Sequence, residues 1–445
     1  MEASLFPLPE PQPAQQTTAP GKPRVQLPNR QQLEWRAVDL EGALSQDHPA
    51  RLIWDFVQQL DLSPWYAQIR AVEGQAGREA IDPAILMALW LLATLEGVGS
   101  ARALDRLCRE HDAYRWLCGG VSVNYHTLAD FRVGQADFLD QLLTQSVAAL
   151  IADGLVSLQR VAQDGMHVRA SAGSGSFRRR AKLEAHLQAA QEQVAVLRQE
   201  LEAEPQASSK RQQAARQRAA QERQARLQKA LQRLKEIAPD KKPRAKRTNP
   251  KRRKREPRAS STDAQARVMK MADGGLRPAY DVQFATDTST QVIAGVMVSN
   301  QGNDKGLLGQ MQAQLAERYG LRPQEALVDG GYVHYGDFDA VSQQGTVIYA
   351  PPSNYRSQQA DPYLPQPKDL PSIAAWRQRM ATPAAQAIYK QRAATAECVN
   401  AIAHNRGLQA FLVRGLAKVK AVALWFALLH TLVRGRALRL AAGQA

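Results

Sequence analysis

Helical spacing of hydrophobic residues dominates the chain between a polar N-terminal stretch and about residue 155. Apolar side chains recur three and four positions apart at Leu52, Ile53, Phe56, Val57 and Leu60. Asp82 and Pro83 supply a cap and a first-turn proline for a helix over residues 84–95. Ser100 and Asn124 precede further helical stretches. We therefore expect residues 36–155 to form an all-helical domain.

Successive short helices joined by short turns suit two kinds of structure. One is a DNA-binding domain of the helix-turn-helix kind, and the other is a plain helical bundle. The spacing of the apolar residues does not distinguish them. The strongly apolar stretch 84–95 is too short to span a bilayer, so we expect no membrane association.

From about Tyr280, the spacing of apolar and polar residues becomes that of β-strands. Residues 280–286 and 291–298 flank a polar turn at 287–290, which predicts a β-hairpin. Further strands are expected at 158–168, 326–329 and 346–350, and helices at 306–319 and 383–440. This order predicts an α/β core, in which a sheet is flanked by helices and interrupted by an insertion. We expect the core to comprise residues 156–175 and 260–440, and the insertion residues 176–259.

The insertion carries the charge of the protein. The whole chain has a formal net charge of +16, and residues 176–258 hold 25 Lys/Arg and 9 Asp/Glu, which accounts for all of it. A heptad-like seam runs through Leu183, Leu187, Ala190, Val194, Leu197 and Leu201, and it resumes at Leu227, Leu231 and Leu234. This seam indicates either a helical hairpin or a dimerising coiled coil. The basic run beyond Pro239 is nearly free of apolar residues, so we expect it to be disordered without DNA.

The composition outside the insertion bears on the N-terminal tail and on the cellular compartment of the protein. Residues 1–35 are rich in Pro and Gln, which predicts a disordered tail, and they lack the basic-then-apolar pattern of a signal peptide. Cys108, Cys118 and Cys398 have no metal-site spacing and form an odd set. We expect packing roles for them in a reducing cytoplasm.

Three acidic residues are candidates for chemistry on phosphates. Asp164 interrupts an apolar strand, Asp329 ends a strand before two glycines, and Glu397 lies on a helix with Tyr389 and Arg392. Carboxylates bind Mg²⁺, and two such ions serve phosphoryl transfer. Each acid also suits a structural role as a turn cap or an arginine partner. Four other acids have similar surroundings, namely Asp281, Asp287, Asp304 and Asp337.

Motifs in order along the chain resemble the DDE transposases of bacterial insertion sequences, in the branch whose last acid lies in a Tyr-Arg-Glu helix. In the N-terminal region they are Asp82-Pro, Ser100-Ala-Arg, Trp116-Leu-Cys-Gly-Gly and Tyr125-His-Thr-Leu-Ala-Asp-Phe-Arg. In the core they include Asp164-Gly-Met-His-Val-Arg-Ala-Ser-Ala, Tyr280-Asp-Val-Gln-Phe-Ala-Thr-Asp, Leu327-Val-Asp-Gly-Gly-Tyr and Ala396-Glu-Cys-Val-Asn-Ala. The resemblance extends from about residue 36 to residue 435.

The resemblance implies a ribonuclease-H-like catalytic core. Asp164, Asp329 and Glu397 would be the catalytic acids and would bind Mg²⁺ or Mn²⁺, with two ions expected. Tyr389 and Arg392 match helix positions thought to contact DNA near the cleaved end. His404 stands where a basic residue is expected, and Arg406 follows two positions later. Further DNA contacts are expected from the basic run Lys251, Arg252, Arg253, Lys254 and Arg255.

The predicted function is transposition: water attacks at a transposon end, and the freed 3′-hydroxyl then attacks target DNA. The expected partners are the terminal inverted repeats, the target duplex and further copies of the chain. The expected location is the bacterial cytoplasm, at the nucleoid. Two alternatives are a nuclease without a joining step and a non-catalytic or decayed transposase relative that retains only DNA binding.

Overall fold

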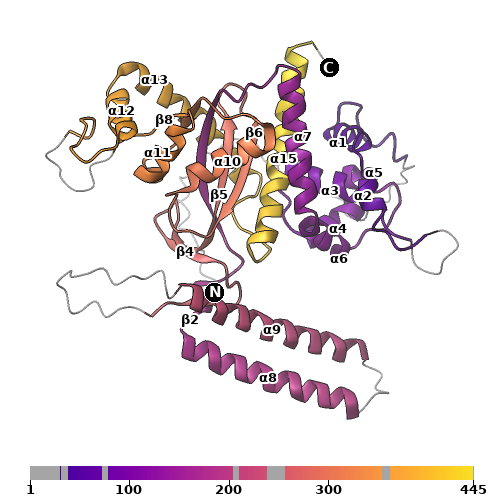
Figure 1. Ribbon diagram of the computed structural model, residues 1–445. Coiled ribbons are helices and arrows are strands. Elements are labelled where there is room, and N and C mark those ends of the chain that lie inside the picture. The colour runs from indigo at the N-terminus through magenta and orange to yellow at the C-terminus, as the bar shows by residue number, and fades with distance from the viewer. Residues whose placement is uncertain are drawn as a thin grey trace, which may run out of the picture.

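The computed structural model describes residue 31 and residues 39–72, 79–203, 210–237, 256–352 and 361–443. Within these ranges the chain forms a helical N-terminal region, a mixed sheet flanked by helices, and a long helical hairpin that projects from the sheet (Figure 1). The fold is therefore α/β with a helical N-terminal region, as expected. Residues 1–30 and 238–255, which hold most of the Pro/Gln-rich tail and the densest basic run, lie outside the described residues.

The N-terminal region consists of short helices that begin where the capping residues predict. They are α1 (Pro49–Gln58), α2 (Ser63–Tyr66), α3 (Pro83–Leu95), α4 (Ala101–Glu110), α5 (Asp112–Cys118), α6 (Tyr125–Gly134) and α7 (Ala136–Ala152). The side chains of Asp82, Ser100 and Asn124 accept hydrogen bonds from the first turns of α3, α4 and α6. Helix α3 is buried on nearly all sides. DNA binding of the helix-turn-helix kind stays a prediction.

A six-stranded mixed sheet forms the centre of the molecule. Its strands are β1 (Arg160–Arg169), β4 (Arg267–Lys270), β5 (Leu276–Asp287), β6 (Ile293–Ser299), β7 (Glu325–Leu327) and β8 (Val347–Tyr349). The strand order is β4-β5-β1-β7-β8, with β6 also paired to β5. The predicted β5–β6 hairpin is confirmed as an antiparallel pair, and β1, β7 and β8 are mutually parallel.

Helices cover both faces of the sheet. They are α10 (Leu307–Tyr319), α11 (Tyr335–Gln343), α12 (Pro371–Met380), α13 (Pro383–Arg392), α14 (Cys398–Asn405) and α15 (Leu416–Ala441). Between α13 and α14 the chain forms a π-helical turn, Ala393–Glu397. Helix α15 lies between the sheet and α7 (Figure 1), and one continuous core joins the N-terminal helices to β5 and β6.

Helix α15 is the main buried helix and was not singled out in the sequence. It is long and apolar enough to cross a membrane by length and composition alone, but 67% of its most apolar window is buried inside the protein. Its Trp425 donates a hydrogen bond to the backbone of Arg132 in α6, and its Thr431 donates one to the backbone of Ile293 in β6. Helix α15 therefore fastens the helical region to the sheet.

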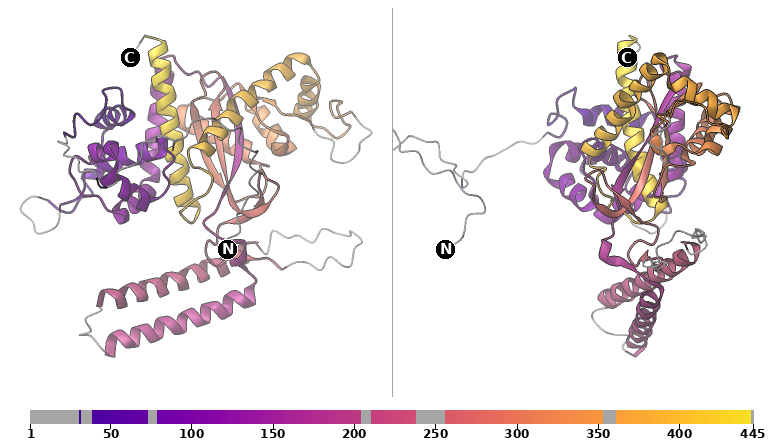
Figure 2. Two further views of the ribbon diagram at one scale, coloured as in Figure 1. Left: turned by 180° about the vertical axis from the view of Figure 1, so that it is seen from behind. Right: turned by 90° about the vertical axis from the view of Figure 1, so that its left-hand side faces the viewer.

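The projecting hairpin, which we call the arm, consists of α8 (Arg180–Ala203) and α9 (Lys210–Ile237). Its helices pack on each other through Leu183, Ala190, Leu227, Ala230 and Leu234. The heptad-like seam thus closes a hairpin within one chain. At its base, strands β2 (Phe177–Arg178) and β3 (Ala259–Ser260) pair antiparallel, so the arm leaves and re-enters the core at one place (Figure 2).

Candidate active site

The register of two parallel strands aligns Asp164 with Asp329. Strand β1 pairs with β7 so that Ala162 lies opposite Leu327, and each acid follows its paired residue by two positions. Strand β7 ends at Leu327, and Asp329 then caps a short 3₁₀ turn through a 2.7 Å hydrogen bond from the Gly331 amide. Asp164 lies in the middle of β1 and Asp329 lies just beyond the end of the shorter β7, so the parallel register makes the two acids neighbours. The negative charge of Asp329 is one cause of the raised pKa of Asp164.

Asp164 is held by two side chains from the C-terminal helices. Arg392 Nη2 lies 3.0 Å from Asp164 Oδ1, and Asn400 Nδ2 donates to Asp164 Oδ2 at 3.0 Å. Burial raises the pKa of Asp164 to about 6; the charge of Arg392 opposes the rise, and that of Asp329 adds to it. Ionised Asp164 is therefore costly in this site, and nearby positive charge lowers that cost.

The π-helical turn determines how Arg392 reaches Glu397. Arg392 ends α13, and the wider turn that follows leads to Glu397 immediately before α14. Arg392 Nη1 lies 3.0 Å from Glu397 Oε1, so one guanidinium bridges Asp164 and Glu397. The Glu397 side chain keeps 58% of its surface exposed. The structure thus brings all three predicted acids into one neighbourhood, with Arg392 between two of them.

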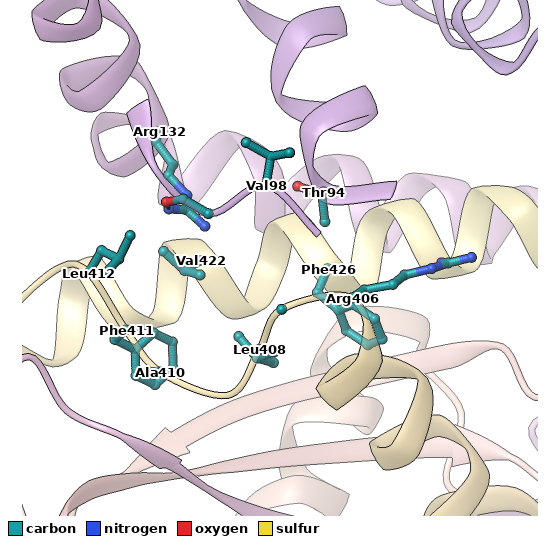
Figure 3. A pocket seen from close by; sticks show the side chains of 12 residues that line it. Thr94, Val98, Arg132, Arg406, Leu408, Ala410, Phe411, Leu412, Val422 and Phe426 are labelled. Carbon is teal, nitrogen blue, oxygen red and sulfur yellow. Dashed lines mark hydrogen bonds between the residues drawn. The ribbon is translucent and has the colours of Figure 1, made fainter. Parts of the chain in front are cut away.

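The residues predicted to contact DNA are placed less uniformly. Arg392 is buried against the acids, Tyr389 is partly buried, and His404 is exposed. Arg406 lines a small cavity of about 30 Å³ with Arg132, between the N-terminal helices and α15 (Figure 3). Burial lowers the pKa of Arg406. Lys251 to Arg255 lie outside the described residues, and DNA contact by any of these side chains stays a prediction.

A second pair of acids lies beside the predicted site and was not selected from the sequence. Gln283 Nε2 donates to Asp281 Oδ2 at 2.7 Å and to Asp304 Oδ1 at 2.9 Å. Burial and then the charge of Asp304 raise the pKa of Asp281 to about 8. Burial and then the charge of Asp329 raise the pKa of Asp304. The available signal was the motif position of Asp281, directly after Tyr280.

The donor chemistry of the site suits a hard divalent cation, because the candidate ligands are carboxylate oxygens. Within the described ranges, no three His, Cys, Asp or Glu side chains are arranged as a ready-made metal site. The carboxylate of Glu397 is already engaged, because its Oε1 accepts a hydrogen bond from Arg392. Metal binding by the three acids would therefore require this bond to open.

Comparison with known proteins bears on the N-terminal region. Residues 38–133 match the family described as "Transposase domain (DUF772)". The matched stretch contains α1 to α5 and nearly all of α6, and it excludes the sheet and the three acids. Searches of curated proteins and of solved structures returned no match. The family match supports a transposase family for this chain.

Proposed function

We propose that the protein is an insertion-sequence transposase of the DDE type. Asp164, Asp329 and Glu397 are its catalytic acids, and they lie on a ribonuclease-H-like core. The observation that carries the proposal is the β1–β7 register, because it aligns Asp164, in the middle of β1, with Asp329, just beyond the end of the parallel strand β7. The mixed sheet, with helices on both faces, supports the same fold assignment.

The three acids would hold two Mg²⁺ or Mn²⁺ ions. When bound, such ions activate the attacking oxygen and stabilise the leaving oxygen of the phosphodiester. The chain positions the acids, and Asn400 orients Asp164 through its 3.0 Å hydrogen bond. Arg392 compensates the charge of Asp164 and Glu397; binding of the ions by Glu397 would open its bond to Arg392 and would leave the guanidinium free to meet a DNA phosphate. The substrates are the transposon ends and the target duplex, bound by an oligomer of the chain at the nucleoid.

Substitution of Asp329 by Asn tests the proposal most directly. We expect Mg²⁺-dependent cleavage of the cognate ends to fall by about 10³-fold or more, because a positioned metal ligand is lost, while end binding is retained. Asp153→Asn changes an exposed acid at the end of α7 and serves as the matched control. Wild-type protein that binds its ends and never cleaves them with Mg²⁺ or Mn²⁺ would contradict the catalytic proposal.

A joining assay separates the transposase from a nuclease with the same core. Pre-cleaved ends carrying a free 3′-hydroxyl are supplied with a target duplex and Mg²⁺. The transposase is expected to give joined product, and Asp329→Asn is expected to give none. Cleavage without any joined product would favour the nuclease.

A further inference from the structure

The two helices of the arm differ sharply in charge. Helix α9 contains nine Lys/Arg and two Asp/Glu, a net of +7, whereas α8 contains three Lys/Arg and four Asp/Glu, a net of −1. A solvated hairpin without a partner has no need for such asymmetry, since both helices gain solubility from charge of either sign. The asymmetry indicates that one side of the arm faces a polyanion.

Four basic residues of α9 lie on the side away from α8. Arg218, Arg226, Lys229 and Arg233 are spaced by eight, three and four positions, which places them on one helical face. The buried residues Ala220, Leu227 and Leu234 occupy the opposite face of α9, and Leu227 and Leu234 pack against α8. Arg226 and Arg233 are paired with Glu222 and Glu236.

Two cations on this face are available to a ligand. Arg218 and Lys229 are both exposed. Among the residues that the structure describes, neither forms an ion pair with a carboxylate. Their distance along the helix, eleven residues at about 1.5 Å each, is close to 16 Å. Both can therefore meet phosphates on one stretch of duplex.

The position of α9 suits a long partner that also reaches the acids. Figures 1 and 2 show α9 between α8 and the rest of the molecule. The arm continues from the C-terminal end of β1, the strand that carries Asp164. With 28 residues, α9 is about 42 Å long, which corresponds to about 12 base pairs of B-DNA.

We propose that the face of α9 turned away from α8 binds the phosphate backbone of duplex DNA, over about one helical turn, beside the DNA held at the acids. Helix α8 supports α9 and makes no DNA contact. Because phosphate contacts carry no base information, this surface acts on transposon and target sequences alike. The surface deepens the proposed function and rests on it for the identity of the DNA at the acids, but binding along α9 itself needs neither metal nor cleavage.

Salt-dependent binding of a labelled duplex of about 30 base pairs, roughly three helical turns, tests the surface in the full chain. Arg218→Gln combined with Lys229→Gln removes two positive charges from α9. Gln191→Glu combined with Gln199→Glu changes the exposed surface of α8 by the same net charge. We expect the α9 variant to lower the slope of log affinity against log salt by about 2, and the α8 variant to leave it unchanged.

Three results would overturn the proposal. The first is an unchanged slope in the α9 variant, and the second is an equal decrease in both variants, which would mean a general charge effect. The third is a change in the oligomeric mass of the free protein without a change in slope, which would make α9 a contact between copies. Circular dichroism and thermal melting confirm that both variants fold. Failure of cleavage in wild type, with the slopes as expected, would reject only the catalytic proposal.

Discussion

Arg392 Nη2 lies 3.0 Å from Asp164 Oδ1, and the same guanidinium reaches Glu397 through Nη1. Only 9% of Arg392 is exposed, so the bridge is largely shielded from water. Burial opposes the charged form of Arg392, but the charges of Asp164 and Asp329 outweigh it and raise the pKa of the guanidinium. In this state the arginine supplies the positive charge that the acids require.

Arg392→Gln should therefore destabilise the protein at neutral pH and much less at pH 5. The variant removes a charge that lowers the pKa of Asp164, so at pH 7.5 the folded protein must either bury an uncompensated carboxylate or protonate it, at a cost of about 1–3 kcal/mol. At pH 5, below the wild-type pKa of about 6, Asp164 is protonated with or without Arg392 and needs no partner. Urea unfolding at the two pH values measures the difference. Arg414→Gln, which removes an arginine bonded to the Ser171 backbone, is the control. An equal loss at both pH values would contradict the charge argument.

Asp281→Asn is expected to stabilise the protein at alkaline pH. The pKa of Asp281 is raised from 3.8 to about 8, so wild type loses stability as pH rises from about 4 through 8. The amide is neutral throughout and still accepts from Gln283. Thermal melting at pH 5 and pH 9 should show near-equal midpoints at pH 5 and a higher midpoint for the variant at pH 9. A variant that melts lower at pH 9 would show that the carboxylate is favourably bound.

His430 should make the protein sensitive to mild acid. The ring is 3% exposed, its Nε2 lies 2.9 Å from the Gln291 carbonyl oxygen, and burial lowers its pKa to about 4. Because the unfolded chain binds the proton first, the free energy of unfolding should fall by about 2 kcal/mol between pH 7 and pH 5 from this residue. His430→Gln removes that contribution. Urea unfolding at both pH values should give a smaller difference in the variant, and an unchanged difference would refute the assignment.

Gly165→Ala should destabilise the core beside the acids. A Cβ at this strand position would meet Gln283 Nε2 and would lie 2.6 Å from Asp281 Oδ1. Overpacking of this kind costs about 1–3 kcal/mol. Gly173→Ala is the matched control, because a Cβ there meets nothing within 4 Å. Equal unfolding free energies for the two variants would show that the pocket beside β1 adjusts without cost.

The elements with strong local patterns could be predicted from the sequence. The β5–β6 hairpin, the caps at Asp82 and Asn124, and the short strand before Asp329 all follow from side-chain alternation or cap chemistry. The charge of the arm and its seam were visible for the same reason. The local pattern could not show whether the two halves of the seam pack on each other within one chain or against the helices of a second chain.

The candidate site was predictable only in part. The alignment of Asp164 with Asp329 depends on the register of two strands, which is a property of the sheet. The pairing of Arg392 with two acids depends on a π-helical turn, and the spacing of apolar residues does not predict such a turn. Asp281 lies two residues from Gln283 and Asp304 lies 21 residues from it, so only tertiary structure brings Asp304 to the amide that both acids share. Helix α15 lies within the helical stretch expected at residues 383–440, but its bounds were not predicted because its apolar residues give only a weak amphipathic period.

The pairing of β2 with β3 has an evolutionary consequence. Phe177, just before α8, lies opposite Ser260, which follows α9, so the chain is joined to itself at the base of the arm. Because β2 and β3 hold the chain together at the base of the arm, a longer or shorter arm changes the conformational entropy of the arm alone. The core can therefore form with an arm of any length. Arms of other lengths or charges can thus be exchanged at this junction without altering the strands that carry Asp164 and Asp329. Under the proposed function, the reach of the protein along DNA and the chemistry at its acids would be separable traits, open to selection independently of each other.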